Sequence, residues 1–198
     1  MEKTVVISPH TLAVVGREEE NGQSNTTIMS FHEEDDQKLD LCAKKVMDIA
    51  CREFGISLRG LIEGSKMLSR ITHKPPIAID RVSGMYFFPT ESPHNRSCSW
   101  IAHSHVLELE KTDRGTNIVF KNGRELFVPA SYHTIINQLY RTAQFRYLLH
   151  NKMEDIWHEQ DYVSESTWLH PAYTRKRQAR QMKYPSVPSM DIDSLEKE

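Results

Sequence analysis

The residue types best suited to chemistry gather between positions 94 and 105. His94, Cys98, His103 and His105 supply three imidazoles and a thiol, which together could complete a tetrahedral zinc site. The spacing contains no Cys-x-x-Cys knuckle, and the last two histidines stand two residues apart on a predicted strand, where they share one face. A metal-dependent enzyme or nuclease would rest on these four residues. The alternative is a pair of half-buried strand histidines that hydrogen-bond to the backbone or to a phosphate.

Other patterns of catalytic residues are missing from the sequence. It contains no Gly-x-Ser-x-Gly turn, no glycine-rich phosphate loop and no His-Glu-x-x-His pair. Glu108 and Glu110 lie on one face of a predicted strand and could act as a general acid and base, or bind a metal. Such pairs are more often exposed sheet residues. We therefore expect no enzymatic activity, no catalytic residues and no cofactor.

A third set of residues is basic and lies on helical or stiff segments. Its members are Arg59, Lys66, Arg70, His73, Lys74, Arg81, Arg141 and Arg146. Long cationic side chains on a helix, or beside Pro75-Pro76, can follow a line of phosphates. The alternative is that these residues only solvate one face of the protein. Solvation alone explains Arg141 and Arg146 less well, because no acid lies between Glu125 and Glu154 to balance their charge. We predict that these eight residues contact a polyanion.

Charge is segregated along the chain, which supports that prediction. Residues 1–40 hold nine acids and three bases, residues 41–152 hold nine and sixteen, and residues 153–198 hold nine and six. The total of −2 therefore hides a basic middle between acidic ends. A basic central region is typical of a protein that meets a nucleic acid or another polyanion.

Hydrophobic periodicity predicts the elements of the first half of the chain. We expect a short hairpin that joins residues 5–7 to 12–15, and a strand over 26–31. A helix should run from about 40 to 54, with the acids at 33–36 placed near its positive end. A second, shorter helix is expected over 58–69.

In the second half we expect two hairpins, one long strand and one long helix. The expected segments are the hairpin of 77–79 with 85–88, the strand 100–110, the hairpin of 117–120 with 125–128, and the helix from Ser131 to Asn151. Asn122-Gly123 favours a type I′ turn in the second hairpin. The apolar stripe of the helix is predicted to contain Ile135, Ile136, Leu139, Tyr140, Ala143 and Tyr147.

Together these elements predict an α+β fold with a mainly antiparallel sheet, two principal helices and a mobile C-terminal tail. We assign residues 1–152 to the globular domain and residues 153–198 to a flexible, partly disordered regulatory tail. No apolar run is long enough to cross a membrane, and no signal peptide is recognisable. Three irregularly spaced cysteines favour reduced thiols and a cytoplasmic location.

Five short strings in the middle of the chain have an unusual composition. They are His73-Lys74-Pro75-Pro76-Ile77, Phe87-Phe88-Pro89-Thr90, Cys98-Ser99-Trp100-Ile101-Ala102-His103-Ser104-His105-Val106, Phe120-Lys121-Asn122-Gly123 and Asn137-Gln138-Leu139-Tyr140-Arg141-Thr142-Ala143. Their order and spacing closely resemble those of the ComK family of competence transcription factors. Cys51-Arg52-Glu53-Phe54-Gly55 extends the resemblance upstream, so that it covers roughly residues 12–152.

The resemblance implies a sequence-specific DNA-binding activator of competence genes, which serve DNA uptake. Family members bind paired AT-rich boxes chiefly through the minor groove, with bending, as dimers that assemble into tetramers. The eight basic residues named above are then the predicted DNA-binding residues of the globular domain, residues 1–152. A cytoplasmic, nucleoid-associated location follows, with no membrane partner. A zinc-dependent enzyme and a protein-interaction module with acidic and mobile docking segments stay as alternatives.

The tail differs from the family pattern. Members carry a Phe-Met-Leu-Tyr-Pro-Lys segment that an adaptor of a AAA+ protease recognises. The corresponding residues here are 181–186, of which only Met182, Tyr184 and Pro185 match. The resemblance therefore implies an adaptor-binding role for these three residues. A basic run at 175–180 precedes them and either solvates the tail or grips phosphate without sequence preference.

Overall fold

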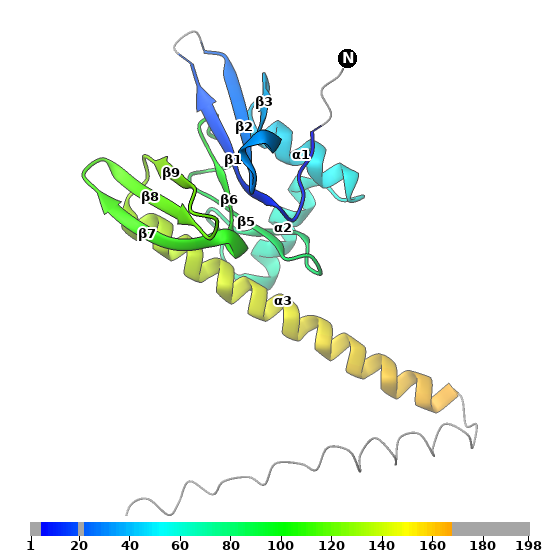
Figure 1. The fold of residues 1–198 in the computed structure, drawn as a ribbon. Helices are drawn as coiled ribbons and strands as arrows, with labels where there is room; N and C mark the ends of the chain where they lie inside the picture. Colours follow the sequence, from blue (N-terminus) through cyan, green and yellow to red (C-terminus); the bar gives the residue numbers. More distant parts are fainter. Residues whose placement is uncertain (1–4, 20–21, 168–198) are drawn as a thin grey trace, which may run out of the picture. The chain divides into compact units, whose positions relative to one another are not determined.

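The computed structural model describes residues 5–19 and 22–167, with side chains placed up to residue 156. The chain divides into two compact units, residues 1–152 and residues 153–198. The elements are β1 (Thr11–Glu18), β2 (Ser24–Ser30), the 3₁₀ turn η1 (Glu33–Asp35), β3 (Gln37–Leu39), α1 (Ala43–Glu53), α2 (Leu58–Ser69), β4 (Ile77–Asp80), β5 (Met85–Pro89), β6 (Trp100–Ala102), the 3₁₀ turn η2 (His103–His105), β7 (Val106–Thr112), β8 (Gly115–Phe120), β9 (Glu125–Val128) and α3 (Tyr132–Thr167) (Figure 1). None of the described helices combines the length and the apolar character that crossing a membrane requires.

The strands form two antiparallel sheets. The larger sheet has six strands in the order β3-β2-β1-β6-β5-β4, and the smaller has three in the order β7-β8-β9. Every neighbouring pair is antiparallel. The predicted α+β class with antiparallel sheets is therefore confirmed, with three helices in the described chain.

The six-stranded sheet is covered on both faces. Side chains alternate between the faces of a strand, so neighbouring residues enter different cores. Phe87 and Trp100 pack with residues of α1 and α2. Phe88 and Ile101 pack instead with β8, β9 and Ile135 of α3. Strands β5 and β6 are consequently buried along their whole length, as are the first six residues of β1.

Several local predictions are confirmed. The second helix, α2, has the predicted bounds, with Ser57 Oγ accepting a hydrogen bond from Gly60 N (3.1 Å) as its N-cap. The two hairpins β4–β5 and β8–β9 also form as expected. The turn type of the second differs from type I′, because Gly123 has a positive φ (83°) and Asn122 does not. A type I turn followed by a left-handed glycine joins these strands.

The predicted hairpin between residues 5–7 and 12–15 is wrong. Strand β1 pairs with β2 on one side and with β6 on the other. Val5 and Ile7 are buried in the core beside α1 and α2 without forming a strand. Their alternating pattern therefore reflects burial of one side of an irregular segment.

The predicted continuous strand over residues 100–110 is also wrong. The 3₁₀ turn η2 interrupts it, so β6 belongs to the larger sheet and β7 to the smaller. Tertiary bonds hold the turn: Ser104 Oγ donates to Gly84 O (2.8 Å), and His105 Nε2 lies 2.7 Å from Pro9 O. His103 and His105 consequently do not share a strand face.

The acids at 33–36 do not precede a helix directly. They form η1 and lead into β3, whereas α1 begins later, at Ala43, and has no acid in its first turn. The predicted dipole role of these acids is therefore wrong.

The long helix differs from its prediction in length and in its buried face. Ser131 Oγ accepts from Thr134 N (3.3 Å), as expected for an N-cap, but α3 continues to Thr167. Tyr140 and Tyr147 are 66% and 64% exposed. The inner stripe keeps the predicted Ile135 and also contains Gln138, Thr142 and Phe145. Two polar side chains occupy it because backbone carbonyls accept their hydrogen bonds.

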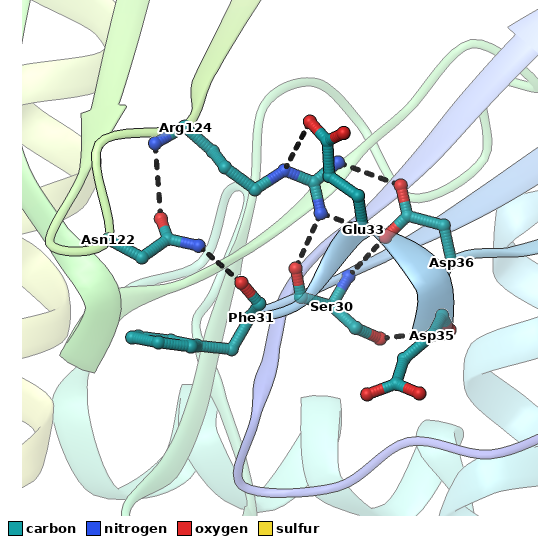
Figure 2. A network of polar contacts seen from close by, with 7 residues as sticks. All are labelled: Ser30, Phe31, Glu33, Asp35, Asp36, Asn122 and Arg124. Atoms are coloured by element: carbon teal, nitrogen blue, oxygen red, sulfur yellow. Dashed lines mark hydrogen bonds and ion pairs between the residues drawn. The ribbon is translucent and has the colours of Figure 1, made fainter.

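A polar network ties the β8–β9 turn to the connection between β2 and β3 (Figure 2). Arg124 makes a two-pronged contact, donating from Nη1 and Nη2 to the two carboxylate oxygens of Asp36 (2.9 and 2.7 Å), and Nη1 also donates to Ser30 O (2.6 Å). Asn122 Nδ2 donates to Phe31 O (2.6 Å). The bond from the guanidinium lowers the pKa of the Asp36 carboxyl from its ordinary value. The network thus joins the smaller sheet to the larger one.

We expect Arg124→Ala to lower the free energy of unfolding by about 2 kcal/mol, because it leaves a largely buried carboxylate and a backbone carbonyl without their donor. Urea unfolding followed by circular dichroism measures the change. The control is Arg59→Ala, which removes a well-exposed i, i+4 pair with Glu63 and should change stability little. Equal losses for the two variants would contradict a special role for the network.

Candidate nucleic-acid interface

A groove of about 910 Å³ opens between α1, α2, the 72–75 segment and the 92–94 loop. Cationic side chains from three of these elements line it: Lys44, Lys45, Arg59, Lys66 and Lys74. His73 and His94 add two imidazoles, and Leu58 and Ile62 contribute apolar surface. The structure therefore brings together four of the eight predicted DNA-binding residues, namely Arg59, Lys66, His73 and Lys74.

Helix α1 contributes its positive end to the groove. Its N-cap residue, Cys42, makes no side-chain cap, and Lys44 and Lys45 occupy the first turn where acids are usually favoured. Both lysines are exposed. The partial positive charge of the helix start and two ammonium groups consequently act together on the same side of the groove, which favours an anion.

Helix α2 contributes the opposite wall. Arg59, Ile62 and Lys66 follow one another at spacings of three and four residues, so they share the helix face that lines the groove. Arg59 Nε contacts Glu63 Oε1 at 2.8 Å, so part of its charge is balanced. Lys66 is exposed and forms no salt bridge within the described ranges.

Among the described residues, two acids line the groove, and each is paired with an arginine. Asp48 contacts Arg52 (2.9 Å), and Glu63 contacts Arg59. The three groove lysines on α1 and α2, at positions 44, 45 and 66, have no carboxylate partner in the part of the chain that the structure describes. The groove consequently carries excess positive charge that a polyanion could neutralise.

Gln138 fixes the 72–75 segment in place. Its side chain is 2% exposed, and Nε2 donates to Lys74 O and to Pro89 O, both at 2.9 Å. Lys74 takes a left-handed φ of 50°, and its Nζ donates to Thr90 O (3.3 Å). The ammonium of Lys74 is therefore partly committed to the backbone, whereas His73 stays exposed at the groove.

The other four predicted residues lie outside the groove lining. Arg141 is exposed, and its Nη1 lies 3.5 Å from His73 O, so it borders the same segment. Arg70 ends α2 in a left-handed conformation, and Arg81 lies in the exposed β4–β5 turn. Arg146 lies in a second cavity with His103.

The contacts of Arg146 hold its guanidinium against the sheet. Its carbon Cζ lies 4.6 Å from the centre of the Tyr86 ring, and Nη1 lies 3.0 Å from His103 Nδ1. Burial, together with the charge of Arg146, lowers the pKa of His103 to about 4. A neutral imidazole at physiological pH can accept the hydrogen bond from the guanidinium.

The residues of the proposed zinc site have separate roles. His94 lines the groove, His103 contacts Arg146, and His105 contacts a backbone carbonyl. Cys98 is buried, and burial raises the pKa of its thiol to about 11. Among residues 5–19 and 22–156 no group of three or more His, Cys, Asp or Glu side chains is arranged to hold a metal ion. The structure therefore does not bring the four side chains of the zinc-site alternative together.

Two further predicted sites have different outcomes. Glu108 and Glu110 are exposed on β7, and Glu110 accepts a hydrogen bond from Asn117 (2.9 Å). Met182, Tyr184 and Pro185, the predicted adaptor-binding residues, lie outside the described residues.

The predicted DNA-binding residues did not include three groove residues: Lys44, Lys45 and His94, the last of which was assigned to the zinc-site alternative. A signal for the lysines does exist, because two cations in the first turn of a helix oppose its dipole and need another reason to be there. His94 offers no comparable signal, since only the folded loop brings it to the groove.

Comparison with known proteins identifies the family. The family model described as ComK protein matches residues 2–154. The chain belongs to the ComK family. The competence transcription factor of Bacillus subtilis (strain 168) is 40% identical over 103 residues, which are 52% of this chain and 54% of that protein. The match thus spans about half the length of this relative, and no solved structure matches the chain significantly.

The ComK match covers both the groove and the polar residues that support it. All groove-lining residues, and Gln138 as well, lie between positions 42 and 138. The resemblance drawn from the five sequence strings is confirmed by this match.

We expect Gln138→Met to lower the free energy of unfolding by about 2 kcal/mol, because the carbonyls of Lys74 and Pro89 lose a buried donor. Denaturant unfolding of the full chain measures the loss. Gln144→Met is the matched control, since Gln144 is exposed on the same helix and should tolerate the change. A loss no larger than that of the control would show that this amide does not hold the segment.

Proposed function

We propose that this protein is a sequence-specific DNA-binding activator of competence genes, and that the groove between α1 and α2 contacts the phosphates of the duplex. The observation that carries the proposal is the excess positive charge of the groove, with three lysines that lack a carboxylate partner among the described residues. Membership of the ComK family and the similarity to the competence transcription factor of B. subtilis support the same function.

Phosphate contacts by lysines explain affinity more than sequence choice. Each ammonium that meets a phosphate releases a condensed counterion, so binding weakens steeply as salt rises. The positive end of α1 adds a contact that needs no side-chain rearrangement. The exposed imidazoles of His73 and His94 extend the groove with donors that can also reach phosphate oxygens.

The finer parts of the proposal come from the family resemblance, and they agree with binding through contacts between cations and phosphates. AT-rich sequences narrow the minor groove and make it strongly negative, which attracts cations without base-specific bonds. We propose AT-rich paired boxes as the target, read mainly through the minor groove with bending of the duplex. A homodimer or tetramer would place one groove on each box, and a AAA+ protease adaptor would bind Met182, Tyr184 and Pro185.

We expect Lys66→Ala to weaken binding to an AT-rich two-box duplex and to flatten the slope of log K against log salt by about one unit. Fluorescence anisotropy at several salt concentrations measures both quantities, with a scrambled duplex as the sequence control. Lys111→Ala removes one exposed lysine from β7, outside the groove, and should leave the slope unchanged. Identical slopes for the two variants would reject the groove as the phosphate-contacting surface.

A further inference from the structure

A second cavity, of about 300 Å³, lies between η2, the start of β7, the β8–β9 turn and α3. Its lining consists of His103, Ser104, Val106, Lys121, Leu139 and Arg146. Two of these residues are permanent cations at neutral pH, and none is an acid. The cavity therefore has an uncompensated positive charge of its own, separate from the groove between α1 and α2.

The guanidinium of Arg146 is held by neutral groups alone. Tyr86 lies beneath it at 4.6 Å, and one amino group, Nη1, reaches His103 Nδ1 (3.0 Å) and Ser104 Oγ (3.4 Å). The Ser104 hydroxyl already donates to Gly84 O (2.8 Å), so its oxygen acts as an acceptor for the arginine. No carboxylate contacts Arg146 in the part of the chain with described side chains.

This arrangement leaves one edge of the guanidinium for a ligand. The hydrogen bonds to His103 and Ser104 use Nη1, whereas Nη2 and Nε retain parallel donors that match two oxygens of a tetrahedral oxyanion. The contact with the Tyr86 ring fixes the plane of the guanidinium, a fork of parallel N–H donors, before a ligand arrives. Less side-chain entropy is therefore lost on binding. Lys121 supplies a mobile point charge at the same cavity.

We propose that this cavity binds a phosphate group, with Arg146 as the planar fork and Lys121 as the second cation. His103 is a positioning residue, because its Nδ1 orients the fork without touching the ligand. Burial, together with Arg146, keeps this imidazole neutral at physiological pH, so it accepts from the guanidinium and adds no repulsion. A protonated imidazole would lose that acceptor.

The phosphate could belong to the DNA backbone or to a free phosphate-bearing small molecule. Arg141 and Arg146 lie five residues apart on α3, the first beside the 73–74 segment and the second in this cavity. Their separation along the axis is about 7.5 Å at the rise of an α-helix. A duplex seated on the groove has the repeating phosphates to reach both, whereas a small molecule would occupy the cavity alone.

Inorganic phosphate titrated into the full-length protein at neutral pH tests the site, with sodium chloride added to keep ionic strength constant. The ring resonances of His103 report occupancy by NMR and are expected to shift saturably. Lys121→Ala should weaken the fitted phosphate affinity by about tenfold, since it removes one charge-assisted hydrogen bond. Arg146→Lys should weaken it as well, because the charge stays but the fork is lost. Lys111→Ala, the matched control, should bind as the unaltered protein does.

An AT-rich duplex added to the phosphate-bound protein identifies the source. If the duplex raises the apparent Kd for inorganic phosphate and Lys121→Ala flattens the salt slope of DNA binding by about one unit, the phosphate belongs to the backbone. If the apparent Kd and the slope stay unchanged, the ligand is a free phosphate-bearing molecule. A linear response to phosphate, or equal affinities for Lys121→Ala and Lys111→Ala, overturns the proposal. That result leaves the groove untouched, because Lys66→Ala tests it separately.

Discussion

Burial of both faces of the six-stranded sheet is the constraint on which the rest of the structure depends. Phe87 and Phe88, adjacent on β5, enter opposite cores, one with α1 and α2 and the other with the smaller sheet and α3. Strands β5 and β6, buried along their whole length, offer no surface for a ligand. Both basic cavities are accordingly built from helices, turns and loops rather than from central strands.

Polar side chains with buried or half-buried partners hold these covering elements in place. Arg124 fastens the smaller sheet through Asp36, and Gln138 fastens the 72–75 segment to α3 and β5. His103 and Tyr86 do the same for Arg146. In each case a polar group would be costly to leave unsatisfied, and one geometry satisfies it. The cations on these covering elements are therefore held in fixed positions.

Local signals explain what the sequence could predict, and distant contacts explain what it could not. The bounds of α2 and the two hairpins of the second half of the chain follow from capping, turn residues and periodicity. The break at His103–His105 depends on bonds to residues far away in the chain, and alternation continues through it in the sequence. Gln138 lies on the inner face of α3 for the same reason, which moved Tyr140 outward. In the groove, Lys66 was predicted from a basic stretch of the sequence. Lys44 and Lys45 were not predicted, because the acids at 33–36 were expected beside the positive end of α1.

Lysine footprinting of the full-length protein, free and bound to an AT-rich duplex, tests the central claim that the groove meets DNA. Amine-reactive labelling with mass spectrometry reports each lysine separately. The account predicts that Lys44, Lys45 and Lys66 lose reactivity in the complex while Lys111 on β7 keeps its own. Unchanged labelling of the three groove lysines, with protection of Lys111, would contradict it.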